Sequence, residues 1–266
     1  MSVQPIREEQ VYTDNVIQFR QKNNDKQKKG AEQKKEIKLK KDGTIKQTPN
    51  NTKCNRDDIQ PIKEEDIPRM VKWLREYRDS SNNNEEYQIR FRNLTMFIMG
   101  INIALRVSDL ISLKWSDVYN NNWEFLDGKK IMPKKTSNKK KHVLLAYNNS
   151  FRRAISEYKE YINPKKLDSY IFTSRQNPSG HIGAGTVEKF IKTMVEELEI
   201  TYPICTHSMR KTFARIRYEH SEDKTRTLLE LMQMFRHSSP DITLGYICIK
   251  AEEIKDLFYA VELGYD

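Results

Sequence analysis

The sequence has few cysteines, few apolar residues and no long hydrophobic run. Its three cysteines are an odd, scattered set without Cys-x-x-Cys spacing: Cys54, Cys205 and Cys248. Such a set excludes a disulfide framework and a cysteine-rich zinc site, and it is typical of reduced thiols inside the cell. The most apolar run, from Leu94 to Leu105, is too short to cross a bilayer, so it predicts a buried helix of a soluble, cytoplasmic protein.

Common signatures of ATP-driven and metal-dependent enzymes are also missing. The sequence contains no Gly-x-x-x-x-Gly-Lys-Ser/Thr loop, which argues against ATP-driven chemistry. It contains no His-Glu-x-x-His motif and no carboxylate cluster of the kind found in two-metal nucleases. We therefore expect no metal and no other cofactor. If the protein cuts a nucleic acid, it uses a side-chain nucleophile.

Positive charge is what the chain has in excess. Lys and Arg number 47 against 37 Asp and Glu, a formal net charge of +10. This balance favours a polyanionic partner, nucleic acid first and an anionic membrane surface second. Residues 1–56 are rich in Lys, Gln, Asn and Glu and have almost no apolar clusters, so we expect a flexible basic arm there. Residues 57–266 form the expected globular domain.

From residue 57 onward, apolar residues recur mostly at helical spacing. The pattern predicts one helix that begins after Ile62, a short one from Pro240, and others at about 85–105, 107–113, 150–161, 186–198, 207–220, 225–235 and 251–263. Between residues 115 and 147 the period changes, and three short strands are expected at 123–125, 130–132 and 143–146. Asp127-Gly128 is a favourable hairpin turn between the first two. The predicted fold class is α+β, mostly α-helical, with a small three-stranded antiparallel sheet.

Three blocks of sequence stand out within this domain. They are Ala104-Leu-Arg-Val-Ser-Asp-Leu, Thr206-His-Ser-Met-Arg-Lys-Thr-Phe-Ala and His237-Ser-Ser-Pro-Asp-Ile-Thr-Leu-Gly-Tyr. Each block alone is a weak signal, but together, in this order and at these separations, they resemble the catalytic domain of the tyrosine recombinase (phage integrase) family over residues 57–266. The resemblance implies the catalytic set Arg106, Lys135, His207, Arg210, His237 and Tyr246, with Asp109 in a supporting role.

The resemblance also implies a mechanism. Tyr246 attacks a DNA phosphate, a 3′-phosphotyrosyl link forms, and Lys135 protonates the leaving 5′-oxygen. Four neighbouring lysines are alternative acids or phosphate contacts, and Arg236 is a further DNA-binding candidate; the lysines are Lys134, Lys139, Lys140 and Lys141. The implied partners are double-stranded DNA and further copies of the chain, which would assemble as a tetramer through the C-terminal helix.

The residue types fit this chemistry independently. Two guanidinium groups, Arg106 and Arg210, can grip a phosphate and stay ionised at cellular pH. His207 lies one helical turn before Arg210, where it can accept a proton. Tyr246 is one of 13 tyrosines, and its spacing from His237 singles it out from decoys such as Tyr259.

The sequence departs from the family pattern in two ways. The motif commonly has glycine where this chain has Ala104 and Arg236, and a helical core-binding domain is expected before residue 57, where this sequence has only the basic arm. Two alternatives to a site-specific recombinase therefore stay open. One is a type IB topoisomerase-like enzyme with the same residue set. The other is a DNA-binding or plasmid-maintenance protein that no longer cuts.

Overall fold

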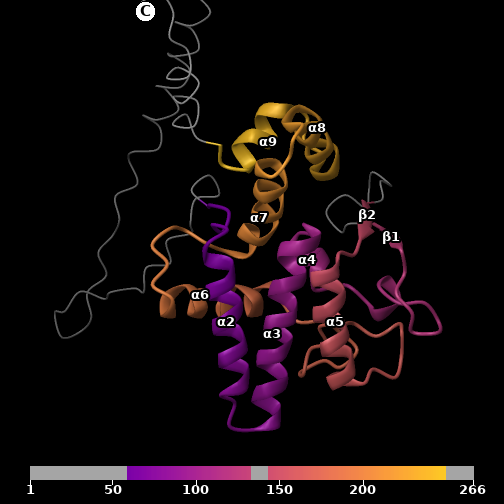
Figure 1. Cartoon of the computed structure of the whole chain (residues 1–266). Coiled ribbons are helices and arrows are strands. Elements are labelled where there is room, and N and C mark those ends of the chain that lie inside the picture. Colours follow the sequence, from indigo (N-terminus) through magenta and orange to yellow (C-terminus); the bar gives the residue numbers. More distant parts are fainter. Residues whose placement is uncertain (1–58, 133–142, 250–266) are drawn as a thin grey trace, which may run out of the picture. The chain divides into compact units, whose positions relative to one another are not determined.

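Figure 1 shows the computed structural model of the chain, which describes residues 59–132 and 143–249. Helices dominate these residues, as the sequence pattern predicts. The α-helices are α2 (Asp66–Asp79), α3 (Asn84–Ile103), α4 (Val107–Leu110), α5 (Asn149–Ile162), α6 (Ala184–Glu197), α7 (Thr206–Glu219), α8 (Lys224–Phe235) and α9 (Pro240–Tyr246). A single 3-10 turn, η1 (Trp115–Asp117), and two strands complete the described elements.

Helix α3 is the central element of the main hydrophobic core. It contacts α2, α5 and α7, and α2 and α5 lie along it in Figure 1. Its apolar residues include Phe97 and Met99, both fully buried. Asn83 caps its start by accepting a hydrogen bond from the Glu86 N–H at 2.9 Å. The helix ends at Ala104, whose φ of 52° lies in the left-handed region.

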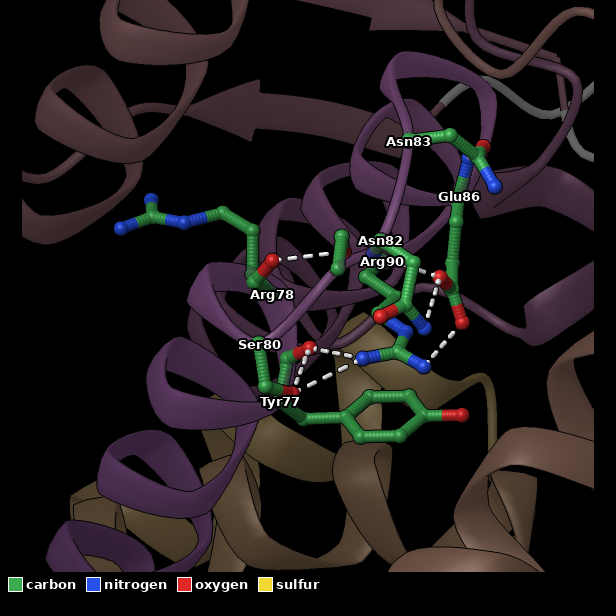
Figure 2. A network of polar contacts seen from close by, with 8 residues as sticks. Tyr77, Arg78, Ser80, Asn82, Asn83, Glu86 and Arg90 are labelled. Carbon is green, nitrogen blue, oxygen red and sulfur yellow. Dashed lines mark hydrogen bonds and ion pairs between the residues drawn. The ribbon is translucent and has the colours of Figure 1, made fainter.

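The turn between α2 and α3 is fixed by a polar network centred on Arg90 (Figure 2). The Arg90 guanidinium donates to the Tyr77 carbonyl at 2.6 Å and to the Ser80 hydroxyl at 2.9 Å, and it pairs with the Glu86 carboxylate. It also lies 3.7 Å from the centroid of the Tyr77 ring. Because one side chain bonds to both helices, this network holds the hairpin together at its tip.

Gly100 sets the distance between α3 and α7. A Cβ atom at this position would lie 2.5 Å from Sδ of Met209 and 3.3 Å from Cδ2 of Leu110. Met209 is the residue before Arg210 on α7. The absence of a side chain at Gly100 therefore lets α7 approach α3 closely enough to place Arg210 beside the end of α3.

The sheet differs from the predicted one. Within the described residues it has two antiparallel strands, β1 (Gly128–Ile131) and β2 (Val143–Ala146), with Gly128 paired to Ala146. The predicted strand at 123–125 is wrong: Phe125 makes only an isolated bridge with Tyr119. The hairpin predicted at Asp127-Gly128 is wrong for the same reason. Trp123 has a φ of 60° and packs against the main core, so this segment curls inward instead of extending.

Helices α7, α8 and α9 enclose a second, smaller core. Its buried residues are Ala104, Ala214, Leu231, Phe235 and Ile247. The helix predicted at 251–263 and the arm predicted at 1–56 lie outside the described residues. No helix among the described residues is long and apolar enough to cross a membrane.

Candidate active site

The first motif turns the chain at the end of α3. Ala104 adopts the left-handed conformation, and Arg106 then occupies the N-cap position of α4 in an extended conformation. This turn leaves Arg106 half-buried at the start of a short helix. Asp109, on the same helix, is only 4% exposed. Its charge acts on the Arg210 guanidinium and raises the pKa of that group.

Arg210 is buried on α7, where it faces the end of α3. Its side chain is 8% exposed, it donates to the Ala104 carbonyl, and its guanidinium lies 4.2 Å from the centroid of the Phe235 ring. Burial lowers the pKa of Arg210 to about 10, and the nearby Tyr246 and Asp109 partly offset the effect of burial. At neutral pH the guanidinium is still charged. The bond to Ala104 fixes the cation at the point where the first and second motifs meet.

Tyr246 and His237 close the other side of this site. Tyr246 is the last residue of α9, and its ring contacts those of Phe235 and His237, with centroid distances of 5.1 Å and 5.2 Å. His237 follows α8, and its Nδ1 lies 3.0 Å from the hydroxyl of the fully buried Thr243. The middle of α9, at Thr243, and its last residue, Tyr246, therefore both contact the cluster around Arg210.

The electrostatics of the Tyr246 hydroxyl reflect two opposing effects. Burial raises its pKa, whereas the Arg210 and Arg106 guanidiniums act to lower it, and burial prevails. The hydroxyl is buried and makes no hydrogen bond of regular geometry with any described residue, although Arg210 lies close enough to influence it. The phenol is therefore protonated at neutral pH, and its oxygen is still available to bond with an incoming group.

The structure thus brings together four of the six predicted catalytic residues. These four are Arg106, Arg210, His237 and Tyr246. Burial lowers the pKa of His237, and the Arg210 and Arg106 guanidiniums lower it further. His207 lies in the first turn of α7 with an exposed side chain. Lys135 and the neighbouring candidates Lys134, Lys139, Lys140 and Lys141 lie outside the described residues. Arg236 is half-exposed next to His237.

Both positions at which this chain lacks the glycine of the family motif have positive φ. Ala104 has a φ of 52° and Arg236 a φ of 60°. At Arg236 the left-handed turn is closed by hydrogen bonds from the Arg236 N–H to Gln233 O at 3.2 Å and from the His237 N–H to Met232 O at 3.0 Å. The backbone turn before His237 is therefore formed without glycine, at the cost of left-handed strain in a residue with a Cβ.

Sequence reasoning missed Lys211. This lysine follows Arg210 on α7, is 5% exposed, and has its Nζ 5.4 Å from the centroid of the Tyr246 ring. The only signal in the sequence was a lysine beside a motif arginine on a helix, and that pattern does not distinguish a buried side chain from a solvated one.

Comparison with known proteins identifies the family of the chain. The sequence profile of the phage integrase family matches residues 60–253. A probable integrase/recombinase of Bacillus subtilis (strain 168), YoeC, is 34% identical over 162 residues, which is 59% of this chain and 78% of that protein. The chain therefore belongs to the phage integrase family. Members of this family are tyrosine recombinases, enzymes that recombine DNA at specific sites by cutting and rejoining strands.

Solved structures show the same fold at lower sequence identity. The XerA recombinase matches 77% of this chain with a TM-score of 0.52 and 17% identity, and the match covers 65% of that chain. The XerH site-specific recombinase, in a post-cleavage complex with its difH substrate, matches 74% with a TM-score of 0.55 and 15% identity. Only 51% of the XerH chain is matched, so this chain spans about half to two thirds of these structures.

Proposed function

We propose that this protein recombines double-stranded DNA at specific sites, with Tyr246 as the covalent nucleophile. The observation that carries the proposal is the buried Tyr246 hydroxyl, which lies beside Arg210 and within the influence of Arg106. A scissile phosphate that enters this site meets two cations and an oxygen without a regular hydrogen bond. These are the groups that an in-line displacement at phosphorus requires.

In the proposed reaction, the Tyr246 oxygen forms a bond to phosphorus while the bond to the 5′-oxygen of the next nucleotide breaks. His207 accepts the phenol proton, and Lys135 donates a proton to the departing 5′-oxygen. Arg106 and Arg210 stabilise the charge on the non-bridging oxygens. The 5′-hydroxyl of a partner strand then attacks the 3′-phosphotyrosyl link and releases Tyr246, so the energy of the broken bond is kept and no ATP is consumed.

His237 assists as a hydrogen-bond donor to the phosphate. Its Nδ1 lies 3.0 Å from the Thr243 hydroxyl. When Nδ1 accepts the Thr243 proton, Nε2 carries the ring proton and can donate to a phosphate oxygen. The lowered pKa of His237 favours this neutral form in the absence of DNA.

Further proposals concern DNA binding and assembly. Arg236 and the lysines at 134 and 139–141 contact phosphates on either side of the cut. The protein resides on the nucleoid in the cytoplasm.

On DNA the chains assemble as a tetramer through the C-terminal segment. The apolar residues of this segment recur at helical spacing; these are Ile254, Leu257, Phe258 and Val261.

A groove on the catalytic domain supports this mode of assembly. It has a volume of about 630 Å³ and is lined by residues of α2, α3, α5 and α7, including Ile98, Ile101 and Phe213, with Arg75 and Arg217 among its polar residues. The C-terminal segment adds acidic residues such as Glu252 and Asp256 to its apolar stripe, so charge and hydrophobicity are both complementary. Removing residues 251–266 should abolish the tetramer on DNA in sedimentation velocity, whereas an unchanged tetramer would contradict this route.

Covalent trapping tests the nucleophile. DNA with a 5′-bridging phosphorothiolate at the cut cannot be religated, so a phosphotyrosyl adduct accumulates and is seen on a denaturing gel. We expect an adduct with the wild type and none with Tyr246→Phe, whereas Tyr218→Phe, on the same domain, should form it normally. An adduct that persists in Tyr246→Phe would assign the nucleophile to another residue. No adduct with any variant on DNA that is bound would favour the non-cleaving alternative, and relaxation of supercoiled DNA without site dependence would favour the topoisomerase.

A further inference from the structure

Three segments that are distant in sequence meet at the ammonium group of Lys211. Its Nζ donates to the Ile59 carbonyl at 2.6 Å and to Sγ of Cys248 at 3.4 Å. The Cys248 thiol in turn lies 3.4 Å from the same Ile59 carbonyl. One buried cation therefore joins the beginning of the described domain, the middle of α7 and the second residue after the helix of Tyr246.

Cys248 is the residue at which α9 is closed. Its φ of 57° is left-handed. The N–H of Cys248 bonds to Gly245 O at 3.2 Å, and that of Ile249 bonds to Leu244 O, also at 3.2 Å. This pattern terminates a helix and satisfies its last carbonyls. The position of the Cys248 turn therefore determines where α9 ends, and Tyr246 is the last residue of α9.

Helix α7 holds this turn from two consecutive turns of its own. Lys211 reaches the Cys248 thiol, and Arg215 donates from Nη1 to the Cys248 carbonyl at 3.2 Å. Residues four apart on a helix lie on one face, so both side chains project from α7 toward the same turn. The adjacent residue Arg210 instead faces the Tyr246 hydroxyl.

We propose that Lys211 is a positioning residue of the strand-cleavage reaction, because its bonds to Ile59 and Cys248 hold the end of α9 so that Tyr246 lies beside Arg210. The inference rests on the proposed role of Tyr246. Helix α9 is only 7 residues long, so its own hydrogen bonds define its orientation poorly and contacts at its ends determine where the phenol lies. The Lys211 ammonium bonds to Ile59 and Cys248 and not to the phenol oxygen, so it acts through the helix.

The test separates cleavage from binding. Single-turnover formation of the phosphotyrosyl adduct is measured at saturating phosphorothiolate DNA, and the DNA dissociation constant is measured separately. For Lys211→Met we expect the adduct to form on the order of 10- to 100-fold more slowly, because small misplacements of a nucleophile have effects of this size. The dissociation constant should change less than about twofold, because Lys211 is buried. Lys192→Met is the matched control, since it removes an exposed lysine that pairs with Glu196 on α6.

A double-mutant cycle tests whether Lys211 acts through Cys248. Cys248→Ala should slow the adduct less than Lys211→Met does, and the double variant should be no slower than Lys211→Met. If the two losses multiply, the Lys211–Cys248 contact is not the route. A wild-type rate in Lys211→Met would overturn the proposal. If that variant does not fold, Lys211→Gln, which keeps an N–H donor, and Cys248→Ala give the same comparison. An adduct that forms in Tyr246→Phe would overturn the proposed nucleophile instead, so the two failures are distinguishable.

Discussion

The core around α3 and the group of helices α7, α8 and α9 each bury an arginine, in different surroundings. Arg92, on α3, is 7% exposed, and its one hydrogen bond to a described side chain is a 3.3 Å contact with Asn93. Arg210, on α7, is 8% exposed, donates to the Ala104 carbonyl and lies beside Tyr246. Burial lowers the pKa of both.

The difference shows that burial of a cation does not by itself mark a site. At Arg92 the phenol of Tyr158, which lies in the hydrophobic core, acts against the effect of burial on the pKa. Near Arg210 there is a second guanidinium, Arg106, together with a phenol that lacks a regular hydrogen bond. Two like charges repel, so their proximity disfavours the empty site and favours an anion between them.

The largest expected effect comes from replacing each of these two arginines with methionine in separate variants. Arg210→Met should slow adduct formation at saturating DNA at least about 100-fold, which corresponds to about 3 kcal/mol of lost stabilisation of the transition state. Arg92→Met should leave that rate within about twofold. Its free energy of unfolding should be equal to or higher than that of the wild type, because an apolar group replaces a buried charge without an acidic partner.

Single-turnover adduct formation measures the rates of these two variants, and urea unfolding measures their free energies of unfolding. If Arg92→Met slowed cleavage as strongly as Arg210→Met, the core arginine would belong to the reaction and the contrast between the two regions would fail. If neither variant changed the rate, the phosphate would be bound elsewhere.

Much of the framework was predictable because it follows from local patterns. The spacing of apolar residues gives α3, α5 and α8 within a few residues of their observed bounds, and Pro240 marks the start of α9 as predicted. The three site blocks were recognisable for the same reason, since each lies within one or two consecutive elements. Which of their residues act in the reaction is still a prediction, and Lys135 lies outside the described residues.

Features that depend on contacts between distant segments could not be predicted. The expected strand at 123–125 has suitable β-forming residues, but Trp123 instead packs into the core formed by α5 and η1 residues such as Tyr158 and Trp115. Similarly, Lys211 bonds to Ile59, 152 residues away in sequence. No periodicity or spacing encodes such a contact, so a lysine on a helix is read as exposed by default.

The second prediction concerns backbone strain in the two regions. Arg236 has a φ of 60° next to His237, whereas the left-handed residue that ends α5 is Asn163, a residue type that tolerates this conformation. Arg236→Gly should raise the free energy of unfolding by about 0.5–1 kcal/mol, whereas Asn163→Gly should change it by less than about half as much. Ala104→Gly should be close to neutral, because the relief of strain is offset by loss of a buried methyl group in the second core.

Urea unfolding measures these changes, and DNA affinity measured in parallel shows what Arg236 provides in return. If Arg236 contacts a phosphate as proposed, Arg236→Gly binds DNA more weakly and with a smaller salt dependence although it is more stable. If Arg236→Gly and Asn163→Gly raised the free energy of unfolding equally, backbone strain would not be concentrated beside the site.

The smallest expected effect is the pH dependence contributed by His237. Burial, Arg210 and Arg106 lower its pKa from the ordinary value of 6.5. The unfolded chain therefore takes up a proton near pH 6.5 that the folded protein binds only at lower pH. The contribution of His237 to the free energy of unfolding is thus fully present above about pH 6.5 and is lost as the pH falls through its folded pKa.

Wild type and His237→Gln compared by urea unfolding between about pH 7.5 and 5.5 isolate this contribution, because the other titrating groups are common to both proteins. The wild-type curve should fall more steeply toward acid, and the difference should shrink when DNA is bound. A phosphate placed among Arg106, Arg210 and His237 offsets the two positive charges that hold the pKa down, so the imidazole takes up a proton more readily. If the difference between wild type and His237→Gln were the same with and without DNA, the phosphate would not bind beside His237. The site would then have to be placed nearer to the exposed start of α7.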